Sequence, residues 1–427
     1  MSLGIYISVP FCRSKCSFCN FASGVFSGGA YERYVTQVCT EIAQADRIAG
    51  ELGGRMERTV DSIYLGGGTP SVLAPDQFER LVTAVREEFQ VDPRAEVTVE
   101  CAPGTITPEI LAALCRCGVN RVSLGVQSFV DIECSAVGRL HTRAVTLEDI
   151  AQLRAAGIGN ICVDLIAGLP HQTMESWQFT LSETIASGVP HVSVYMLEVD
   201  EDSRLGNELL AGGSRYHAHS VPDEDLTAEL YLAACERLER GGVQQYEISN
   251  FARPVTHGMG LRASRHNLKY WKRQPYLGFG VDAHSMLAAE EALARQGIEA
   301  VRFATPDDVK TFGQAARQPE PVAARMSQLQ TSRTLINSQT AIEETFFLGL
   351  RMNCGISLAE VSKRYGAETV DSYAAMFAEL EEALLLRHDG DGIALTPRGR
   401  LLSNEVFTRF LRDSQPLDAP VSQGSGC

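Results

Sequence analysis

Short apolar runs rich in β-branched residues recur through the first half of the chain, and segments with helical spacing separate them. The runs cover residues 4–9, 62–67, 96–101, 121–126, 160–166 and 191–197, and the helical segments cover 31–48, 75–89, 107–117, 145–156 and 174–187. Glycine follows three of these helical segments, at Gly118, Gly157 and Gly188, which is a usual stop signal. Strands that alternate with helices of this length predict βαβ units and a parallel sheet.

Six such units in about 200 residues fit an α/β barrel or partial barrel, since a complete eight-unit barrel takes about 250 residues. An open, doubly wound sheet is the competing arrangement. The spacing of apolar residues alone does not choose between them.

The amino-acid composition divides the middle of the chain into helical, loop and linker segments. Residues 224–240 have helical spacing, 253–263 are rich in Gly, Pro and polar residues, and 315–340 carry Gln-Pro-Glu-Pro and runs of Ser, Gln and Thr. We therefore expect a barrel over residues 1–240, an extension of it over 241–314 and a linker over 315–340.

A separate small module is expected at residues 341–412. Helical spacing at 341–351, 358–365 and 370–386 precedes Asp389-Gly390 between two apolar runs, which is a hairpin signal, and a last helix is expected near Pro397. This order predicts a winged-helix-like domain used for packing or docking. Residues 413–427 are expected to form a disordered tail.

The net charge and the hydropathy of the sequence argue against two classes of protein, broad nucleic-acid binders and membrane-spanning proteins. The net charge of −15 leaves no large surplus of Lys and Arg to meet phosphates, so we expect no broad nucleic-acid binding. The sequence contains no run of about 18 apolar residues that would span a membrane. It also starts without a cationic, apolar leader, so the expected location is the cytoplasm.

Three of the twelve cysteines are packed into eight residues, at Cys12, Cys16 and Cys19, directly after the first predicted strand. Iron–sulfur cubes use thiolate ligands, normally four. Three thiolates on one loop would bind three irons and leave the fourth open to the amino and carboxylate groups of S-adenosylmethionine (SAM). We therefore expect a [4Fe–4S] cluster that holds and reduces SAM, with the radical chemistry supplied by the cofactor.

Two other readings of these cysteines stay open. Structural zinc uses four ligands, usually in two separated pairs, and the sequence has no second CxxC pair. A redox pair of Cys16 with Cys19 leaves Cys12 unexplained.

Polar and glycine residues follow the other predicted strands. Gly66-Gly67-Gly68-Thr69-Pro70 ends the second run, where glycines let a ligand approach the backbone and meet its N–H groups. Further side chains at or near later strand ends are Glu100, Gln127, Arg139 and Asp164. Each alone is typical of a cap or salt bridge, but together they predict a polar rim in which carboxylates bind ribose hydroxyls and an arginine binds a carboxylate.

Taken together, these motifs resemble the radical-SAM superfamily, and within it the branch of oxygen-independent coproporphyrinogen III oxidase and the haem chaperone HemW. The resemblance runs from about residue 4 to 285 on the segments YISVPFCRSKCSFCNF, LGGGTPS, NRVSLGVQSF, GRLH, DLIAGLP, YEISNFARP, SRHNLKYW and YLGFGVDAHS. It implies a partial (β/α)6 barrel of the TIM type with a helical C-terminal domain. The SAM-contacting set that it implies is Tyr6, Phe18, Gly67, Gly68, Thr69, Glu100, Gln127, Arg139 and Asp164.

Within that branch the sequence is more similar to HemW. Phe21 stands where the oxidase carries a further cysteine, and the oxidase has extra N-terminal residues. The resemblance implies that haem is bound as cargo and delivered to client haemoproteins, with an electron donor for the cluster. Radical decarboxylation of coproporphyrinogen III is the alternative, and a cluster used only for docking is a third reading.

The resemblance also suggests a haem ligand. His266, in the strip His266-Asn267-x-x-Tyr270-Trp271, is the candidate, and His141 and His284 are its rivals. Residues 255–263 form a longer loop than the family has before this strip. The sequence leaves a homodimer and peripheral contact with a membrane open.

Overall fold

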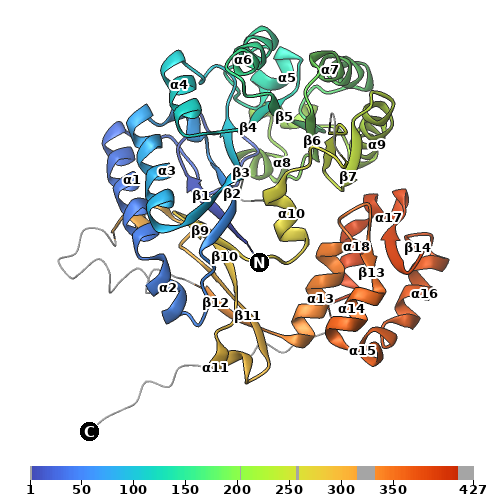
Figure 1. The fold of residues 1–427 in the computed structure, drawn as a ribbon. Helices are drawn as coiled ribbons and strands as arrows, with labels where there is room; N and C mark the ends of the chain where they lie inside the picture. Colours follow the sequence, from blue (N-terminus) through green and yellow to red (C-terminus); the bar gives the residue numbers. More distant parts are fainter. Residues whose placement is uncertain (1, 202, 256–258, 315–331, 412–427) are drawn as a thin grey trace. The chain divides into compact units, whose positions relative to one another are not determined.

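The computed structural model describes residues 2–201, 203–255, 259–314 and 332–411. Its backbone contacts divide the chain into two compact units, Met1–Ser338 and Gln339–Cys427 (Figure 1).

Six parallel strands in sequence order form the core of the first unit. They are β1 (Leu3–Val9), β2 (Thr59–Gly67), β3 (Gln90–Cys101), β4 (Arg121–Gln127), β5 (Asn160–Ala167) and β6 (His191–Met196). Each strand pairs in parallel with the next, so the order never reverses as it would in a doubly wound sheet. The fold is therefore the partial (β/α)6 barrel, and the predicted strands are confirmed.

Further strands extend the sheet on both sides. Beyond β1 lie β9 (Tyr276–Phe279), β10 (His284–Ala288), β11 (Ile298–Ala304) and β12 (Ser332–Asn337), and beyond β6 lie β8 (Asn250–Ala252) and β7 (Gln244–Glu247). Strand β9 is parallel to β1, whereas β10 to β12 and β8 to β7 are antiparallel additions.

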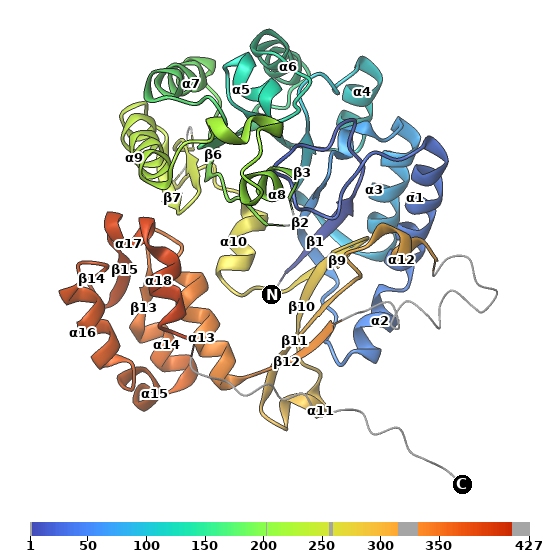
Figure 2. The ribbon, with the colours of Figure 1, turned by 180° about the vertical axis from the view of Figure 1, so that it is seen from behind.

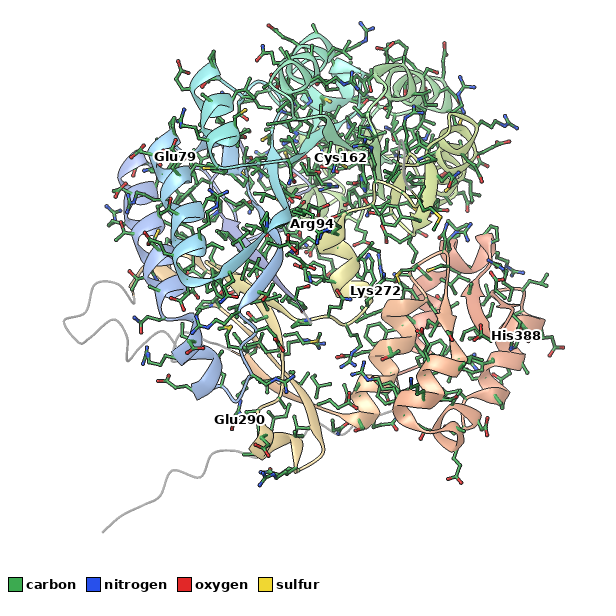
Figure 3. The ribbon with its side chains drawn as sticks, viewed as in Figure 1. Glu79, Arg94, Cys162, Lys272, Glu290 and His388 are labelled. Carbon is green, nitrogen blue, oxygen red and sulfur yellow. The ribbon has the colours of Figure 1, made fainter. Side chains whose placement is uncertain are left out.

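Helices line the outside of the curved sheet (Figures 1 and 2). They are α1 (Gly28–Ala43), α2 (Ala45–Glu51), α3 (Pro75–Glu88), α4 (Pro108–Arg116), α5 (Asp131–Ala136), α6 (Arg143–Ala155), α7 (Met174–Ser187) and α9 (Glu224–Arg240). Figure 3 shows both layers, with Cys162 on a strand and Glu79 on an outer helix. Shorter helices are α8 (Arg204–Leu210), α10 (Arg265–Trp271), α11 (Glu291–Ala294) and α12 (Val309–Gln314).

Local sequence accounts for the ends of these helices. The side chain of Asp223 accepts a hydrogen bond from the Leu226 N–H and so caps α9, and the left-handed Gly188 ends α7. The fully buried Trp177 joins these two helices, because its indole N–H donates to the Leu230 carbonyl at 2.7 Å.

Two predicted segments differ from the structure. The helix expected at 31–48 is divided at Gln44 into α1 and α2. Residues Ser332–Asn337, near the end of the expected linker, form the edge strand β12, which pairs with β11 and buries Ile336. Residues 315–331 of that linker, 256–258 of the long loop, 412 at the end of the expected module and 413–427 of the expected tail lie outside the described residues.

The second unit is a small helical domain with a three-stranded sheet. Its helices are α13 (Ser338–Gly349), α14 (Leu358–Tyr365), α15 (Ala367–Asp371), α16 (Ala374–Glu382), α17 (Pro397–Leu401) and α18 (Ser403–Thr408), and its sheet has the order β13 (Ile356–Ser357), β15 (Gly392–Leu395), β14 (Leu386–Asp389). The predicted hairpin is confirmed, since Asp389 pairs with Gly392 across a two-residue turn. Phe346 packs against Tyr373 and Phe410 in its core.

Candidate functional site

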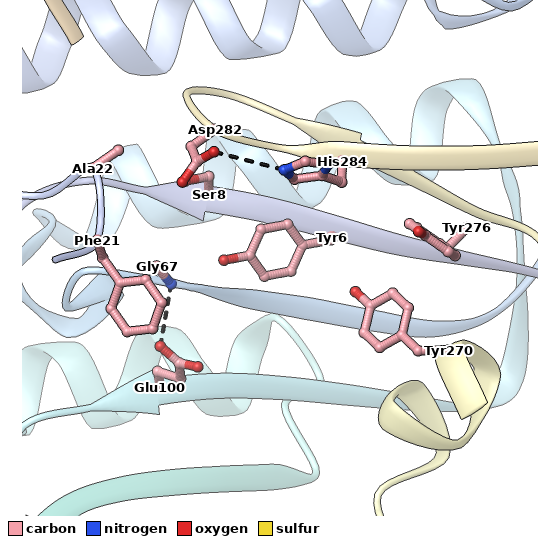
Figure 4. Close-up of a pocket in the computed structure, with 10 residues that line it drawn as sticks. All are labelled: Tyr6, Ser8, Phe21, Ala22, Gly67, Glu100, Tyr270, Tyr276, Asp282 and His284. Atoms are coloured by element: carbon pink, nitrogen blue, oxygen red, sulfur yellow. Dashed lines mark hydrogen bonds and ion pairs between the residues drawn. The ribbon is translucent and has the colours of Figure 1, made fainter. Parts of the chain in front are cut away.

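A pocket of about 360 Å³ opens at the carboxyl ends of β1, β2 and β3 (Figure 4). Its lining residues are Tyr6, Ser8, Phe21, Ala22, Gly67, Glu100, Tyr270, Tyr276, Asp282 and His284. Three residues of the predicted SAM-contacting set, Tyr6, Gly67 and Glu100, lie together here, and so does His284, a rival candidate for the haem ligand. This position agrees with the rule that barrel sites form at the carboxyl ends of the strands.

The cysteine loop begins directly after β1 and lies beside this pocket. The backbone N–H of Cys12 donates to the Gly24 carbonyl at 2.9 Å, which closes the loop at its base. The N–H of Cys19 donates to the Cys16 carbonyl at 3.3 Å. The loop therefore turns back on itself and keeps all three thiols on one short segment.

Two predicted polar residues contact the thiols. The Thr69 hydroxyl donates to the Cys12 sulfur at 3.7 Å, and the Arg139 guanidinium donates to the Cys16 sulfur at 3.7 Å. Cys19 lies 3.8 Å from the Ser23 hydroxyl. Such donors favour the thiolate form, which is the form that binds iron.

Burial acts in the opposite direction on two of these thiols. It raises the pKa of Cys12 against the hydrogen bonds from Thr69 and Ser23, and it raises the pKa of Cys16 against the positive charge of Arg139. Metal binding at such sites releases protons, because the ligand is the thiolate.

The segment that ends in α8 holds the outer side of the cysteine loop. The Leu205 N–H donates to the Ser17 carbonyl at 2.9 Å, and the Asn20 amide donates to Asp200 at 2.7 Å. Arg204 donates to the Lys15 carbonyl. Sequence reasoning missed this support, since nothing local to residues 200–205 points to the cysteines.

The glycine turn after β2 meets the start of the cysteine loop through backbone atoms. The N–H of Gly68 donates to the Val9 carbonyl at 2.8 Å, and a Cβ on Gly68 would lie 2.7 Å from the same oxygen. Gly67 has a φ of 99°, which only glycine adopts readily. Glycine is therefore required here for close approach of two strand ends.

Glu100 lies at the end of β3 on the other side of this turn. Its carboxylate accepts a hydrogen bond from the Tyr64 hydroxyl at 2.8 Å and from the Gly67 N–H at 3.2 Å. Burial raises the pKa of Glu100 to about 7, and the negative charge of Asp164 acts in the same direction.

The remaining predicted residues have separate surroundings. Asp164 accepts hydrogen bonds from the Ser123 hydroxyl at 2.9 Å and the Cys162 thiol at 3.2 Å. Phe18 is partly buried and packs against the cluster of Val137, Ile166 and Leu169.

Two other features are absent from the described part of the chain. It has no group of three or more His, Cys, Asp or Glu side chains placed around one metal ion, and each thiolate of a cube binds a different iron. No helix among the described residues is long and apolar enough to cross a membrane.

Comparison with known proteins identifies the family. Residues 6–183 match the model of the radical SAM superfamily, and residues 336–402 match that of the HemN C-terminal domain. The Heme chaperone HemW of Lactococcus lactis subsp. lactis (strain IL1403) is 31% identical over 96% of this chain and 97% of that protein. This chain belongs to the HemW family of radical-SAM proteins.

Other relatives and a solved structure agree with this assignment. The mitochondrial radical S-adenosyl methionine domain-containing protein 1 of Mus musculus is 31% identical over 98% of this chain and 91% of its own. The structure of coproporphyrinogen III oxidase (HemN) from Escherichia coli superposes with a TM-score of 0.77 at 23% identity, covering 96% of this chain and 90% of that one. At that identity the likeness shows the HemN fold.

The HemW family implies a [4Fe–4S] cluster and SAM, and the residues present fit both. The fit rests on two polar atoms that are buried without a partner in the described structure, Oε1 of Gln127 and Nε of Arg139. Both side chains lie next to Gly125, and Arg139 also contacts Cys16. Buried polar atoms without partners are costly, so a polar ligand beside Cys16 would satisfy them.

His266, the haem ligand expected from the HemW resemblance, is sealed inside the first unit. Only 1% of it is exposed, and burial lowers its pKa to about 3. Its Nδ1 lies 3.0 Å from the Ser62 hydroxyl and its Nε2 lies 2.9 Å from the Tyr270 hydroxyl. Both ring nitrogens are therefore occupied, and His266 joins α10 to β2 instead of facing the pocket.

The HemW-family segment YLGFGVDAHS contributes three pocket residues, Tyr276, Asp282 and His284. The sequence indicated His284 as a rival haem ligand and did not single out Tyr276 and Asp282. The available signal was Gly280 directly after a short apolar run, with an acid and a histidine two and four residues further on, at Asp282 and His284.

Proposed function

We propose that this chain binds haem and delivers it to client haemoproteins, with a [4Fe–4S] cluster and SAM beside the haem. The observation that carries the proposal is the continuity of one pocket. One end of it has Gly67 and Glu100 next to the cysteine loop, and the other end has Tyr270, Tyr276 and His284. Aromatic walls with a few polar groups suit a flat macrocycle.

In this proposal Cys12, Cys16 and Cys19 hold the cluster, and Thr69 and Arg139 donate hydrogen bonds to its ligands. Gly67 and Gly68 let SAM approach the backbone, Glu100 accepts from its ribose hydroxyls, and Gln127 and Arg139 meet its polar groups. When bound, the cluster and SAM supply one-electron chemistry, for which an external reductant is needed. Tyr6 forms the wall between the two ends of the pocket.

The test is anaerobic and separates cargo binding from catalysis. Reconstituted protein is mixed with haem and, in parallel, with coproporphyrinogen III, SAM and a reductant. We expect one haem per chain with a Soret band and transfer of that haem to an apo-haemoprotein. Formation of protoporphyrinogen over many turnovers would overturn the proposal in favour of the oxidase.

Replacing Glu100 with glutamine is expected to weaken SAM binding about fivefold, since a hydrogen bond to a charged acceptor is worth about 1 kcal/mol more than one to a neutral acceptor. Equilibrium dialysis of the cluster-loaded protein measures the change. Glu109→Gln is the matched control, because Glu109 is an exposed glutamate in the first turn of α4 that does not line the pocket. Unchanged affinity in Glu100→Gln would remove Glu100 from the site.

A further inference from the structure

The three histidines that the sequence offers as haem ligands differ sharply in their surroundings. His266 is 1% exposed with both ring nitrogens hydrogen-bonded. His141 is 7% exposed, and its Nε2 lies 3.1 Å from the Val126 carbonyl. The side chain of His284 is 60% exposed and lines the pocket. Of these three, only His284 presents its imidazole to the pocket.

Asp282 accompanies His284 in the pocket (Figure 4). Its Oδ1 lies 3.7 Å from Nε2 of His284, and Nδ1 has no hydrogen-bond partner among the described residues. A carboxylate beside one ring nitrogen is the usual partner of a metal-binding histidine, because it orients the ring and makes the other nitrogen a stronger ligand. The pair thus has the chemistry of an iron ligand with its supporting acid.

The turn that carries this pair is held in an uncommon conformation. Gly280 and Asp282 both have positive φ, of 92° and 53°, and aspartate is among the few residues that tolerate it. Strained turns persist where the surroundings fix them, and they occur often at ligand sites.

Buried hydrogen bonds fix the turn from several sides. The Gly280 N–H donates to the Glu41 carboxyl group at 2.8 Å, and the Val281 N–H donates to the Tyr34 hydroxyl at 2.9 Å. The Ala283 N–H donates to the Thr305 hydroxyl at 2.8 Å. Each of these contacts uses the backbone, so the side chains of Asp282 and His284 stay directed into the pocket.

Aromatic rings line the pocket beside the imidazole. Tyr270 and Tyr276 pack edge to face with their centroids 4.6 Å apart, and Tyr6 lies between these two rings and the Gly67 end of the pocket in Figure 4. An exposed imidazole next to an aromatic wall is the arrangement needed to hold haem iron and the porphyrin face together.

From this geometry we propose that His284 is the axial ligand of the haem iron, with Asp282 as the positioning residue for its imidazole. The inference rests on the proposed function, because it names the ligand for the same cargo. It assigns His266 a structural part, which is to hold α10 and Tyr270 in place. No change of oxidation state is involved, since one imidazole nitrogen donates its lone pair to the iron.

The experiment titrates ferric haem into the anaerobic, full-length protein with its cluster reconstituted. Optical difference spectra and electron paramagnetic resonance report the axial ligand. For His284→Ala we expect about 100-fold weaker haem binding and loss of the histidine-ligated signal, with recovery of that signal on addition of free imidazole. His219→Ala is the matched control, because His219 is exposed and outside the pocket.

Asp282→Asn tests the second half of the proposal, since asparagine also tolerates positive φ. The haem should remain bound to histidine, and its ferric–ferrous midpoint potential should rise because the imidazole loses a negative partner. Iron content and SAM affinity of both variants show whether the fold is intact.

The outcomes separate the two claims. If the unmodified protein takes up no haem, the proposed function and the ligand assignment both fail. If it binds haem and His284→Ala gives the same spectrum and affinity, the ligand assignment is overturned and the proposed function stands. Loss of the histidine signal in His266→Gln but not in His284→Ala would return the ligand to His266.

Discussion

Alanine at Cys12, Cys16 or Cys19, one at a time, should remove nearly all of the about four irons that a cube adds per chain. The loop holds its three thiols on one segment closed by the hydrogen bond from Cys12 to Gly24, so each single variant removes one of the three thiolates that would bind the cluster. Iron analysis and the visible absorption of anaerobically reconstituted protein measure the loss.

Cys115 and Cys354 provide matched controls, because both are exposed cysteines away from the pocket. Alanine at either position should leave the iron content unchanged. Single cysteine variants of the loop that kept the full iron content would contradict the assignment of the cluster, and retention of one tightly bound zinc would favour a different metal site.

The stability of the first unit should depend on pH through Glu41, which is buried in α1 and accepts the hydrogen bond of the Gly280 N–H. Burial raises the pKa of Glu41 from 4.5 to about 8, against the hydrogen bond from Gly280. Its stability contribution is therefore present below pH 4.5 and is lost as the pH rises to about 8, at about 1.4 kcal/mol per pH unit. Glutamine has no such titration and keeps an oxygen for the Gly280 N–H.

Glu41→Gln should accordingly be similar in stability to the unmodified protein at pH 5 and more stable by about 4 kcal/mol at pH 9. Urea unfolding of the cluster-free protein, followed by tryptophan fluorescence, measures the difference. Both tryptophans of the chain, Trp177 and Trp271, belong to the first unit, so the signal reports the unit that contains Glu41.

Glu343→Gln serves as the control for a buried glutamate in the other unit, and its effect should not appear in the tryptophan signal. A stability difference between Glu41→Gln and the unmodified protein that did not change between pH 5 and pH 9 would show that Glu41 titrates normally.

Glu41 connects this stability effect to the pocket. The turn that it holds carries Asp282 and His284, so loss of the Gly280 contact would release the two residues that we assign to haem. A buried acid is a costly way to hold a turn. This loss of stability is consistent with a site in which the orientation of Asp282 and His284 is more important than the stability of the turn.

The sequence alone determined the features that depend on neighbouring residues. The period of apolar residues and the glycines after the helices located six strands and their helices, and the spacing of Cys12, Cys16 and Cys19 indicated one cluster loop. The glycine turn could also be predicted from its run of glycines, and the positive φ of Gly67 agrees with it. The close approach of Gly68 to Val9, a residue far away in the sequence, is seen only in the structure. The strand β12 was missed, since its residues follow a polar stretch without an alternating pattern, and they form a strand by pairing with β11.

Only the tertiary structure decided which side chains face the pocket. His266 and His284 are both histidines in motifs of the same family, and nothing in their neighbouring residues tells that one is sealed by Ser62 and Tyr270 and the other exposed. Glu41 is about 240 residues from Gly280, the residue it holds. The exposure of a side chain and its long-range hydrogen bonds depend on packing between segments that are distant in the sequence. The pattern of apolar and polar residues within one segment therefore cannot predict them.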